Sequence, residues 1–380
     1  MRKEFEDFVS VINNVIFDKS IDVKSIDLEK TYLLAKSHNM RTIFFTFVKK
    51  HFAHDSKIFA KHEREYDLLN YKHVLQCKEY AELCLELKRK NIRYIPFKGI
   101  LLKDLYPSPS MREMSDVDVL ADKNNLSPIK DFLIRRRYSF EHKGHHDVYT
   151  KDPGLCFEIH EALIDKQRNT GFDKHFEDPW KMTIGVGSES ARLSPENEFI
   201  YLLAHLYGHF HQGGTGVRSI LDIYLFKQKH QLDFSYIRSV LEKNGILEFS
   251  ENILKLSDVW FSDTSPTALS DELGEYVITS GSYGTIERMT LDLSNSDSSK
   301  TKNIYKTVKR KLFLNKNEIQ KRYPWAKNIL LFPIAYLARA FDIMTKHNKE
   351  AKHWLNEFKS MDEKKLKEHK ERMRRFGANL

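Results

Sequence analysis

Apolar residues recur at helical spacing along most of the chain. In residues 1–60 this spacing appears in FEDFVSVINNVIF and RTIFFTFVKKHF, and it returns from Ser194 onward in PENEFIYLLAHLYGHFH and RSILDIYLFKQKH. A spacing of three or four residues places the apolar side chains on one face of a helix. Residues 62–90 are expected to form one longer helix, whose buried face is the series Tyr71, Val74, Cys77, Ala81 and Cys84.

The pattern differs between residues 91 and 165, where short apolar runs alternate with polar turns. Strands are predicted at RYIPF (93–97), DVDVLA (116–121), HHDVYTK (145–151) and LCFEIHEAL (155–163). Helices are predicted between them at GILLKDLY (99–106) and SPIKDFLIRRRYSF (127–140). Such an alternation of strands and helices indicates a compact α/β unit.

These changes of pattern divide the chain into four segments. We expect an N-terminal helical segment over 1–90, the α/β core over 91–165, a helical domain over 166–293 and a C-terminal helical segment over 304–380. The last two are separated by SNSDSSKTKN (294–303), whose small, polar and charged residues are typical of a flexible loop.

The composition is that of an ordered globular protein. Of the 380 residues, 41% are hydrophobic and 30% charged, and the counts of 15 Gly and 10 Pro argue against a fibrous chain. The start, MRKEFEDFVSVINNVIFDKS, does not resemble a signal peptide, and NILLFPIAYLA (328–338) is too short to cross a bilayer. Cys77, Cys84 and Cys156 form no C-x-x-C pair. We therefore expect a cytoplasmic protein with reduced cysteines and no membrane insertion.

The net charge of +9 favours anionic partners such as nucleotides, nucleic acid or acidic lipid surfaces. Much of the excess lies in the last third of the chain, for example in KTVKRK (306–311) and KEHKERMRR (367–375). These segments are either solvated basic surfaces or nucleic-acid contacts. The C-terminal one lacks the interleaved aromatic residues of a single-strand binding platform, so we interpret it as solubilising surface.

The stretch MREMSDVDVLAD places Asp116 and Asp118 two residues apart in a predicted strand. Side chains at i and i+2 share a face of a strand, so the two carboxylates repel each other unless a cation lies between them. Mg²⁺ takes oxygen ligands of this kind. Glu158, flanked by apolar residues in another predicted strand, joins the pair if the strands are neighbours. Three such carboxylates can hold two ions for nucleotidyl or phosphoryl transfer. The alternative interpretation is a solvated strand end.

Positively charged residues precede the acidic strand. Lys98 and Gly99 lie where a predicted strand gives way to a helix, and the first N–H groups of a helix can bind phosphate. Gly99 allows the backbone to approach closely, Lys98 adds a mobile charge, and Arg112 can bind a phosphate through two N–H groups. Ser115, directly before Asp116, is also assigned to nucleotide binding.

Together these residues resemble a known family. FKGILLKDLYPSPSMREMSDVDVLAD, followed by the FEIHEAL strand, is similar to the bacterial uncharacterised nucleotidyltransferase family of the DNA polymerase beta-like superfamily. The similarity is strongest over 94–164, and it continues more weakly through AHLYGHF, RSILDIYLF, GSYGT and YPWAKNILLFPIAYLAR. The matching positions are Lys98, Gly99, Tyr106, Pro107, Arg112, Asp116, Asp118, His145 or His146, Glu158 and His160.

The resemblance implies an α+β fold, with a small mixed-sheet nucleotidyltransferase core embedded in a mostly helical chain. It also implies two Mg²⁺ ions, for which Mn²⁺ can substitute. By position, the catalytic metal ligands would be Asp116, Asp118 and Glu158, and Glu158 would also help to activate the acceptor hydroxyl. Gly99 would lie against the triphosphate of the nucleotide.

One departure from the superfamily concerns the strand–helix turn. The superfamily commonly has Gly-Ser or Gly-Gly there, whereas this chain has Gly99-Ile100. The expected phosphate contacts therefore shift to Lys98 and Arg112.

Further polar residues are candidates for the cleft. His205 and His209 have the i, i+4 spacing of metal ligands, but Leu206 stands where a metalloprotease helix has Glu. We interpret the two histidines as core or substrate-facing residues rather than zinc ligands. Arg218 and Asp222 either form an ion pair within one helix or face the cleft.

Histidines near the third carboxylate are also candidates. His160 shares the strand face of Glu158, and it either contacts the metal site and the nucleotide or makes a structural hydrogen bond. His145 and His146 are further cleft candidates.

The predicted reaction is Mg²⁺-dependent attack of an acceptor group on the α-phosphate of an NTP, which transfers the nucleoside monophosphate and releases pyrophosphate. The acceptor is a small molecule, a peptide, a protein or an RNA end. The alternatives are a related phosphoryl-transfer enzyme and a catalytically silent nucleotide- or nucleic-acid-binding protein of the same fold. The intact set of three acids favours an active enzyme.

Overall fold

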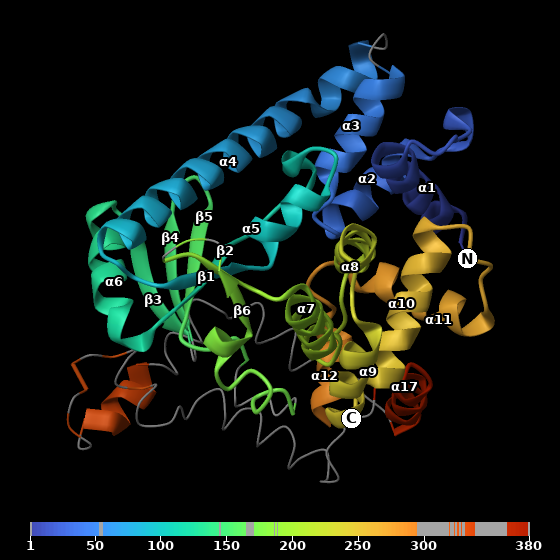
Figure 1. Ribbon diagram of the computed structural model, residues 1–380. Helices are drawn as coiled ribbons and strands as arrows, with labels where there is room; N and C mark the ends of the chain where they lie inside the picture. Colours follow the sequence, from blue (N-terminus) through green and yellow to red (C-terminus); the bar gives the residue numbers. More distant parts are fainter. Residues whose placement is uncertain are drawn as a thin grey trace.

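A computed structural model of the chain describes residues 2–52, 56–143, 146–164, 171–185, 187, 189–294, 319, 323, 325–326, 328, 331–338 and 363–378. A sheet with its own helices lies beside a larger group of helices (Figure 1). This arrangement confirms the predicted α+β fold, in which a small mixed sheet is embedded in a mostly helical chain.

The sheet has five strands in the order β1-β2-β5-β4-β3. Strands β2 and β5 are parallel, and all other neighbours are antiparallel. The strands are β1 (Tyr94–Phe97), β2 (Val117–Ala121), β3 (Ser139–Lys143), β4 (His146–Lys151) and β5 (Leu155–His160). Because β2 and β5 are neighbours, the polar side chains on their shared face lie side by side.

The two faces of the sheet have different coverings. On one face Val117, Val119 and Phe157 pack in one cluster with residues of α4 (Ser56–Arg89) and α6 (Leu126–Arg135). On the other face Phe97 and Leu120 belong to the core of the larger helical group. Side chains alternate between the faces of a strand, so the acids that alternate with the valines of β2 face the helical group.

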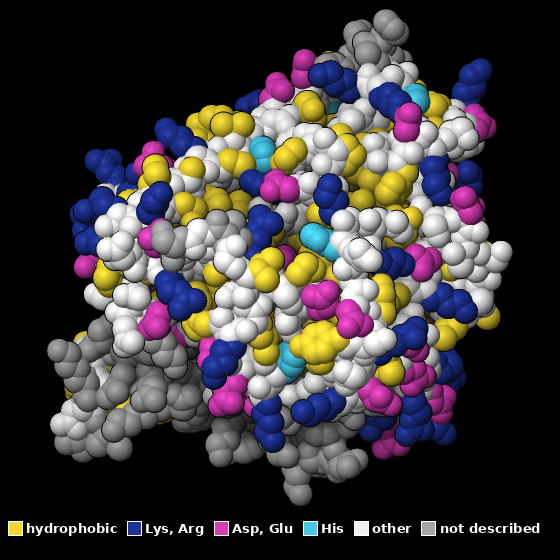
Figure 2. All heavy atoms as spheres, viewed as in Figure 1, with side chains coloured by type: hydrophobic (Ala, Val, Ile, Leu, Met, Phe, Trp, Pro, Cys, Tyr) yellow, Lys and Arg dark blue, Asp and Glu magenta, His cyan; other side chains and the backbone are white. Residues whose placement is uncertain are grey.

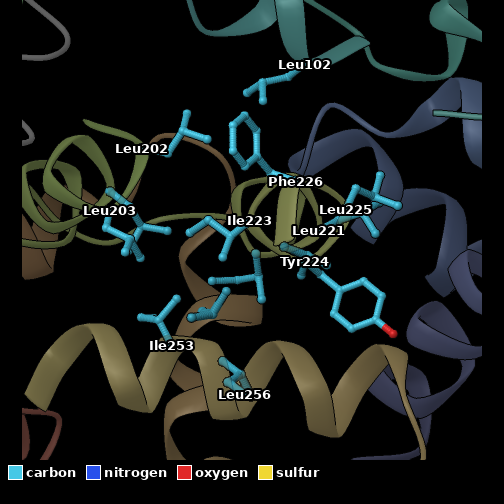
Figure 3. Close-up of a cluster of buried hydrophobic side chains, with 14 of the residues drawn as sticks. Leu102, Leu202, Leu203, Leu221, Ile223, Tyr224, Leu225, Phe226, Ile253 and Leu256 are labelled. Carbon is cyan, nitrogen blue, oxygen red and sulfur yellow. The ribbon is translucent and has the colours of Figure 1, made fainter. Parts of the chain in front are cut away.

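The larger core is built from helices that precede and follow the sheet. At its centre α8 packs against α7 and α10, as Figure 3 shows for Ile223, Leu203 and Ile253. The helices of this group are α1 (Lys3–Phe17), α2 (Leu28–Ser37), α3 (Arg41–Phe52), α7 (Pro195–Phe210), α8 (Val217–Lys229), α9 (Phe234–Lys243), α10 (Leu247–Phe261), α11 (Ala268–Ser280), α12 (Ile286–Ser294) and α17 (Glu363–Arg375).

The basic C-terminal helix α17 packs on this group. Met373 is part of the core, and His369 Nε2 lies 2.7 Å from Asp292 Oδ1 of α12. Arg375 pairs with Glu272 of α11. On the molecular face drawn in Figure 2, Lys and Arg side chains are interspersed with Asp and Glu. KTVKRK and residues 295–303 of the expected loop lie outside the described residues.

Two further expectations concern membranes and cysteines. Within the described ranges, no helix combines the length and the apolar character needed to cross a bilayer. Cys77, Cys84 and Cys156 are not joined in disulfides.

The predicted buried face of α4 is wrong. Tyr71 and Val74 are 57% and 61% exposed, and the buried positions are instead Gln76, Glu79, Leu83 and Leu87. The reason is that polar residues on the buried face form hydrogen bonds with residues of other elements, so this face does not need to be apolar. Glu79 accepts hydrogen bonds from Arg136, Lys151 and Tyr138, and Gln76 donates to the backbone oxygen of Met114. Apolar side chains over α4 remain visible on the surface (Figure 2).

Three predicted helical segments also contain other structure. The expected helix over 127–140 ends at Arg135, since Arg137 has a positive φ of 67° and Ser139–Lys143 pairs with β4 as strand β3. The expected helical segment after residue 166 contains a short hairpin of β6 (Thr183–Gly185) and β7 (Ala191–Leu193). The helix predicted over 99–106 is α-helical only over α5 (Gly99–Leu102) and continues as a 3₁₀ turn.

Candidate active site

The acidic centre of the site is formed by the parallel strands β2 and β5. Asp118 and Glu158 are register partners, so their side chains share the face that points to the helical group. Among the described residues, one group has the spacing of a metal site. Asp118, Glu158 and His160 each offer a ligand atom within 4.8 Å of the others. The expected neighbourhood of the two strands is confirmed, and His160 completes the group of three.

Asp118 is buried and has two close hydrogen-bond partners. Lys98 Nζ donates to its Oδ1 at 2.7 Å, and His160 Nε2 lies 2.9 Å from the same oxygen. Burial by itself would raise the pKa of Asp118, but the positive charge of Lys98 and the hydrogen bond of His160 hold that pKa well below its usual range. Asp118 is therefore ionised at neutral pH.

Asp116 directly precedes β2 and lines the same cavity as Asp118. Burial and the nearby negative charge of Asp118 raise the pKa of Asp116 to about 6, although Lys98 opposes this shift. The two aspartates of the D-x-D pair thus have unequal environments. Asp118 has the Lys98 ammonium beside it. Asp116 is not one of the three possible metal ligands, although it lies near them.

Glu158 lies beside a stacked pair of histidines. His146 Nε2 and His160 Nε2 are each 3.6 Å from Glu158 Oε2, and the two rings stack with their centroids 4.8 Å apart. Burial would raise the pKa of Glu158, but its hydrogen bond with His160 and the charge of Lys98 lower it. His160 thus makes a hydrogen bond with Asp118 and lies among the possible metal ligands, whereas its contact with a metal ion or a nucleotide stays a prediction. His145 lies outside the described residues.

A cavity of about 320 Å³ lies between this acidic centre and the helical group. On the sheet side, the lining includes Lys98, Gly99, Ser115, Asp116, Asp118, His146, Glu158 and His160. On the helical side, the lining includes Tyr201, His205 and His209 of α7 and Arg218, Ser219 and Asp222 of α8. The structure thus brings together all the sequence-predicted site residues that it describes, including the four candidates from the helical segment.

Arg112 and Asp222 form a buried bidentate ion pair. The Nε and Nη2 groups of Arg112 donate to the two oxygens of Asp222 at 2.8 and 2.7 Å, and Tyr106 donates to Asp222 at 2.8 Å. Asp222 therefore pairs with Arg112 from a distant part of the sequence rather than with Arg218 of its own helix. Arg218 instead donates to the backbone oxygen of Glu113 at 2.6 Å.

Gly99 is surrounded closely by protein side chains. A Cβ atom added at Gly99 would lie 2.7 Å from Arg112 Nη1 and 2.9 Å from Met114 Sδ. The absence of a side chain at this position allows Arg112 to pack against the first turn of α5. The contact of Gly99 with a triphosphate stays a prediction.

Two aromatic residues of the site were missed by the sequence analysis. Tyr201 packs edge-on against Phe97 of β1 and stacks on His205. It lies one helical turn before His205, so its position on the same face of α7 could have identified it. Tyr283 is 66% exposed, and its hydroxyl lies 2.5 Å from Ser115 Oγ. Its only sequence signal was the GSYGT segment.

Comparison with known proteins identifies related sequences at the family level. The family model of the uncharacterised nucleotidyltransferases matches residues 24–262, which is more than half of the chain. The match spans the five-stranded sheet and helices α7 and α8 on the far side of the cavity. No curated protein and no solved structure matches the chain.

Proposed function

Since the chain belongs to the uncharacterised nucleotidyltransferase family, we propose that it transfers a nucleoside monophosphate from an NTP to an acceptor hydroxyl or a similar group. The observation that carries this proposal is the register of β2 and β5, which aligns Asp118 with Glu158 at the floor of a cavity. Carboxylates on neighbouring strands are the ligand type required for metal-assisted displacement at phosphorus.

The residues at this position fit a divalent cation. Asp118, Glu158 and His160 offer ligand atoms within 4.8 Å of one another, and Asp116 adds a further carboxylate in the same cavity. Two carboxylates suit Mg²⁺, while an imidazole in the group also suits Mn²⁺. Bound ions would neutralise charge that develops on the phosphate oxygens during transfer.

The chain's own residues have separate roles in this proposal. Lys98 and Asp118 hold each other in place at the cavity floor, which keeps Asp118 ionised. Glu158, whose pKa is lowered, is ionised at neutral pH and can accept the proton of the acceptor hydroxyl. The acceptor oxygen then bonds to the α-phosphorus, the bond from that phosphorus to the bridging oxygen breaks, and pyrophosphate leaves.

The helical side of the cavity is the proposed acceptor side. The acids that would bind the nucleotide through metal lie on the sheet, so an acceptor in line with the α-phosphate has the residues of α7, α8 and Tyr283 within reach. A small molecule, a peptide, a protein side chain or an RNA end remains compatible with this arrangement.

The reaction type is tested with two labelled nucleotides. The protein is incubated with Mg²⁺, cell extract and an NTP labelled at either the α- or the γ-phosphate. We expect acceptor labelling from the α-label and not from the γ-label, and a loss of at least about 100-fold in Asp118→Asn. The matched control is Asp131→Asn, a change at an exposed position of α6.

Other outcomes of this experiment identify the alternatives. Transfer of the γ-label indicates a phosphoryl-transfer enzyme. Nucleotide binding without transfer of either label, by protein whose fold is intact, indicates a catalytically silent binding protein. Transfer that is unchanged in Asp118→Asn contradicts the assignment of that residue.

A further inference from the structure

The helical wall of the cavity contains a positive charge that stands apart from the ion pairs of the site. Among the described residues that line the cavity, Lys98, Arg112 and Arg218 are the three with a positively charged side chain. The first two are bound to carboxylates at 2.7 Å. Arg218, as far as the structure describes the chain, has no carboxylate within ion-pair distance, and its Nη1 donates to a backbone oxygen. Its charge acts on Asp116 through space but is not held in an ion pair within the described part of the chain, so it is available to an anion in the cavity.

Groups that can bind an anion accompany Arg218 on this wall. Thr215 and Ser219, which flank the start of α8, line the cavity, as do His205 and His209 of α7. The Nε2 atoms of the two histidines are 3.0 Å apart. Because a hydrogen bond between two ring nitrogens needs one proton, one ring carries the N–H and the other accepts it.

The sheet side of the cavity, opposite the helical wall, carries negatively charged side chains. Asp116, Asp118 and Glu158 lie there, and the charge of Lys98 is already shared with Asp118. A phosphate group on that side is repelled unless a cation intervenes. The Asp222 carboxylate on the helical side is neutralised by its bidentate pair with Arg112. The cavity is thus divided into a cation-binding wall and a wall suited to anions.

We propose that the helical wall is a phosphate subsite and that Arg218 is its principal binding residue. A guanidinium binds phosphate through two parallel N–H groups, and the Nε and Nη2 groups of Arg218 lie outside its bond to Glu113. This inference rests on the proposed function, since the phosphate belongs to one of the two substrates. It is either the polyphosphate of the nucleotide or a phosphate of the acceptor.

The subsite is tested with inorganic pyrophosphate in buffer that contains EDTA, so that binding through a metal on the acidic wall is removed. Calorimetry of the wild type is expected to detect binding. Arg218→Gln should weaken it at least about tenfold, which equals about 1.4 kcal/mol. Arg238→Gln is the matched control, because Arg238 is an exposed residue of α9 that pairs with Glu251.

A second variant covers the case in which Arg218→Gln unfolds the protein through loss of its bond to Glu113. Ser219→Asp leaves that bond in place and adds a negative charge to the same wall, so it should also weaken pyrophosphate binding at least about tenfold. Pyrophosphate binding that is equal in the wild type and in either folded variant overturns the proposal. An absence of pyrophosphate binding by the wild type overturns it as well.

The source of the phosphate follows from a second titration, with a non-hydrolysable NTP analogue and Mg²⁺. If Arg218→Gln weakens binding of both pyrophosphate and the analogue, the subsite takes the nucleotide's phosphates. If it weakens pyrophosphate binding alone, the subsite takes the acceptor. Both titrations are independent of label transfer, so a failure of the proposed reaction and a failure of the subsite are distinguished.

Discussion

At the scale of single residues, the site is a set of charges that compensate one another. Lys98 places its charge 2.7 Å from Asp118 Oδ1, next to the ligand group in which we propose a cation. Its backbone has φ 56° and ψ −129°, which is unfavourable for a residue with a side chain and is kept only where the surroundings enforce it. Lys98 therefore acts as the resident counter-ion of Asp118, and metal binding must compete with it.

Lys98→Met tests this competition. Removing one partner of a buried ion pair should lower the free energy of unfolding in EDTA by about 3 kcal/mol. Because Asp118 then lacks its counter-ion, Mg²⁺ should stabilise the variant more than it stabilises the wild type. Urea unfolding with and without Mg²⁺ measures both effects, and Lys90→Met at an exposed position is the control. Equal stabilisation of variant and wild type by Mg²⁺ would count against the competition.

Glu198 of α7 provides a pH-dependent prediction away from the acidic centre. It is 8% exposed, and burial raises its pKa from 4.5 to about 7 despite the charge of Arg192. Between these two values the folded protein holds a proton that the unfolded chain has lost, so wild-type stability falls as the pH rises. Glu198→Gln does not titrate. It should match the wild type near pH 4 and be more stable at pH 8 by about 3 kcal/mol, as measured by urea unfolding. A difference that is independent of pH would refute this explanation.

At the scale of elements, sequence patterning located the strands better than the helix faces. Alternation correctly indicated that Asp118 and Glu158 face away from their apolar neighbours, because period two leaves only two choices. For α4 the apolar stripe gave the wrong face, since Glu79 and Gln76 are buried with partners from other elements. Strand β3 was missed because its pairing with β4 outweighs the helical pattern of the preceding residues.

The corrected orientation of α4 predicts unequal effects of substitutions along it. Val74→Ser, at a position 61% exposed, should change the free energy of unfolding by less than about 0.5 kcal/mol. Leu83→Ala, at a fully buried position, should lower it by about 3 kcal/mol. Chemical denaturation of both variants measures the difference. A large loss in Val74→Ser would restore the original assignment of the buried face.

At the scale of the whole molecule, the cavity depends on how the helical group is fixed against the sheet. Arg112 follows the loop after α5 and binds Asp222 of α8, across 110 residues of sequence. No periodicity in the sequence indicates such a pair, and the local spacing of Arg218 and Asp222 suggested another one. The resemblance to the family predicted that the acidic residues of the two strands lie together. The partners across the cavity became apparent only from the three-dimensional structure.

Asp222→Ala leaves the buried Arg112 charge without its carboxylate. It should lower the free energy of unfolding by about 3 to 5 kcal/mol. The double variant Arg112→Met with Asp222→Leu replaces the pair by apolar groups and should recover most of that loss. Urea unfolding of the single and double variants tests the role of the pair. A single variant as stable as the wild type would show that this pair does not hold the two parts together.

Mn²⁺ binding, followed by electron paramagnetic resonance, tests most directly whether Asp118 and Glu158 hold a divalent cation at the cavity floor. We expect the wild type and Asp131→Asn to bind Mn²⁺ equally. Asp118→Asn and Glu158→Gln should each weaken binding at least about tenfold, because each loses a charged ligand. Equal Mn²⁺ binding by all four proteins would contradict this proposal.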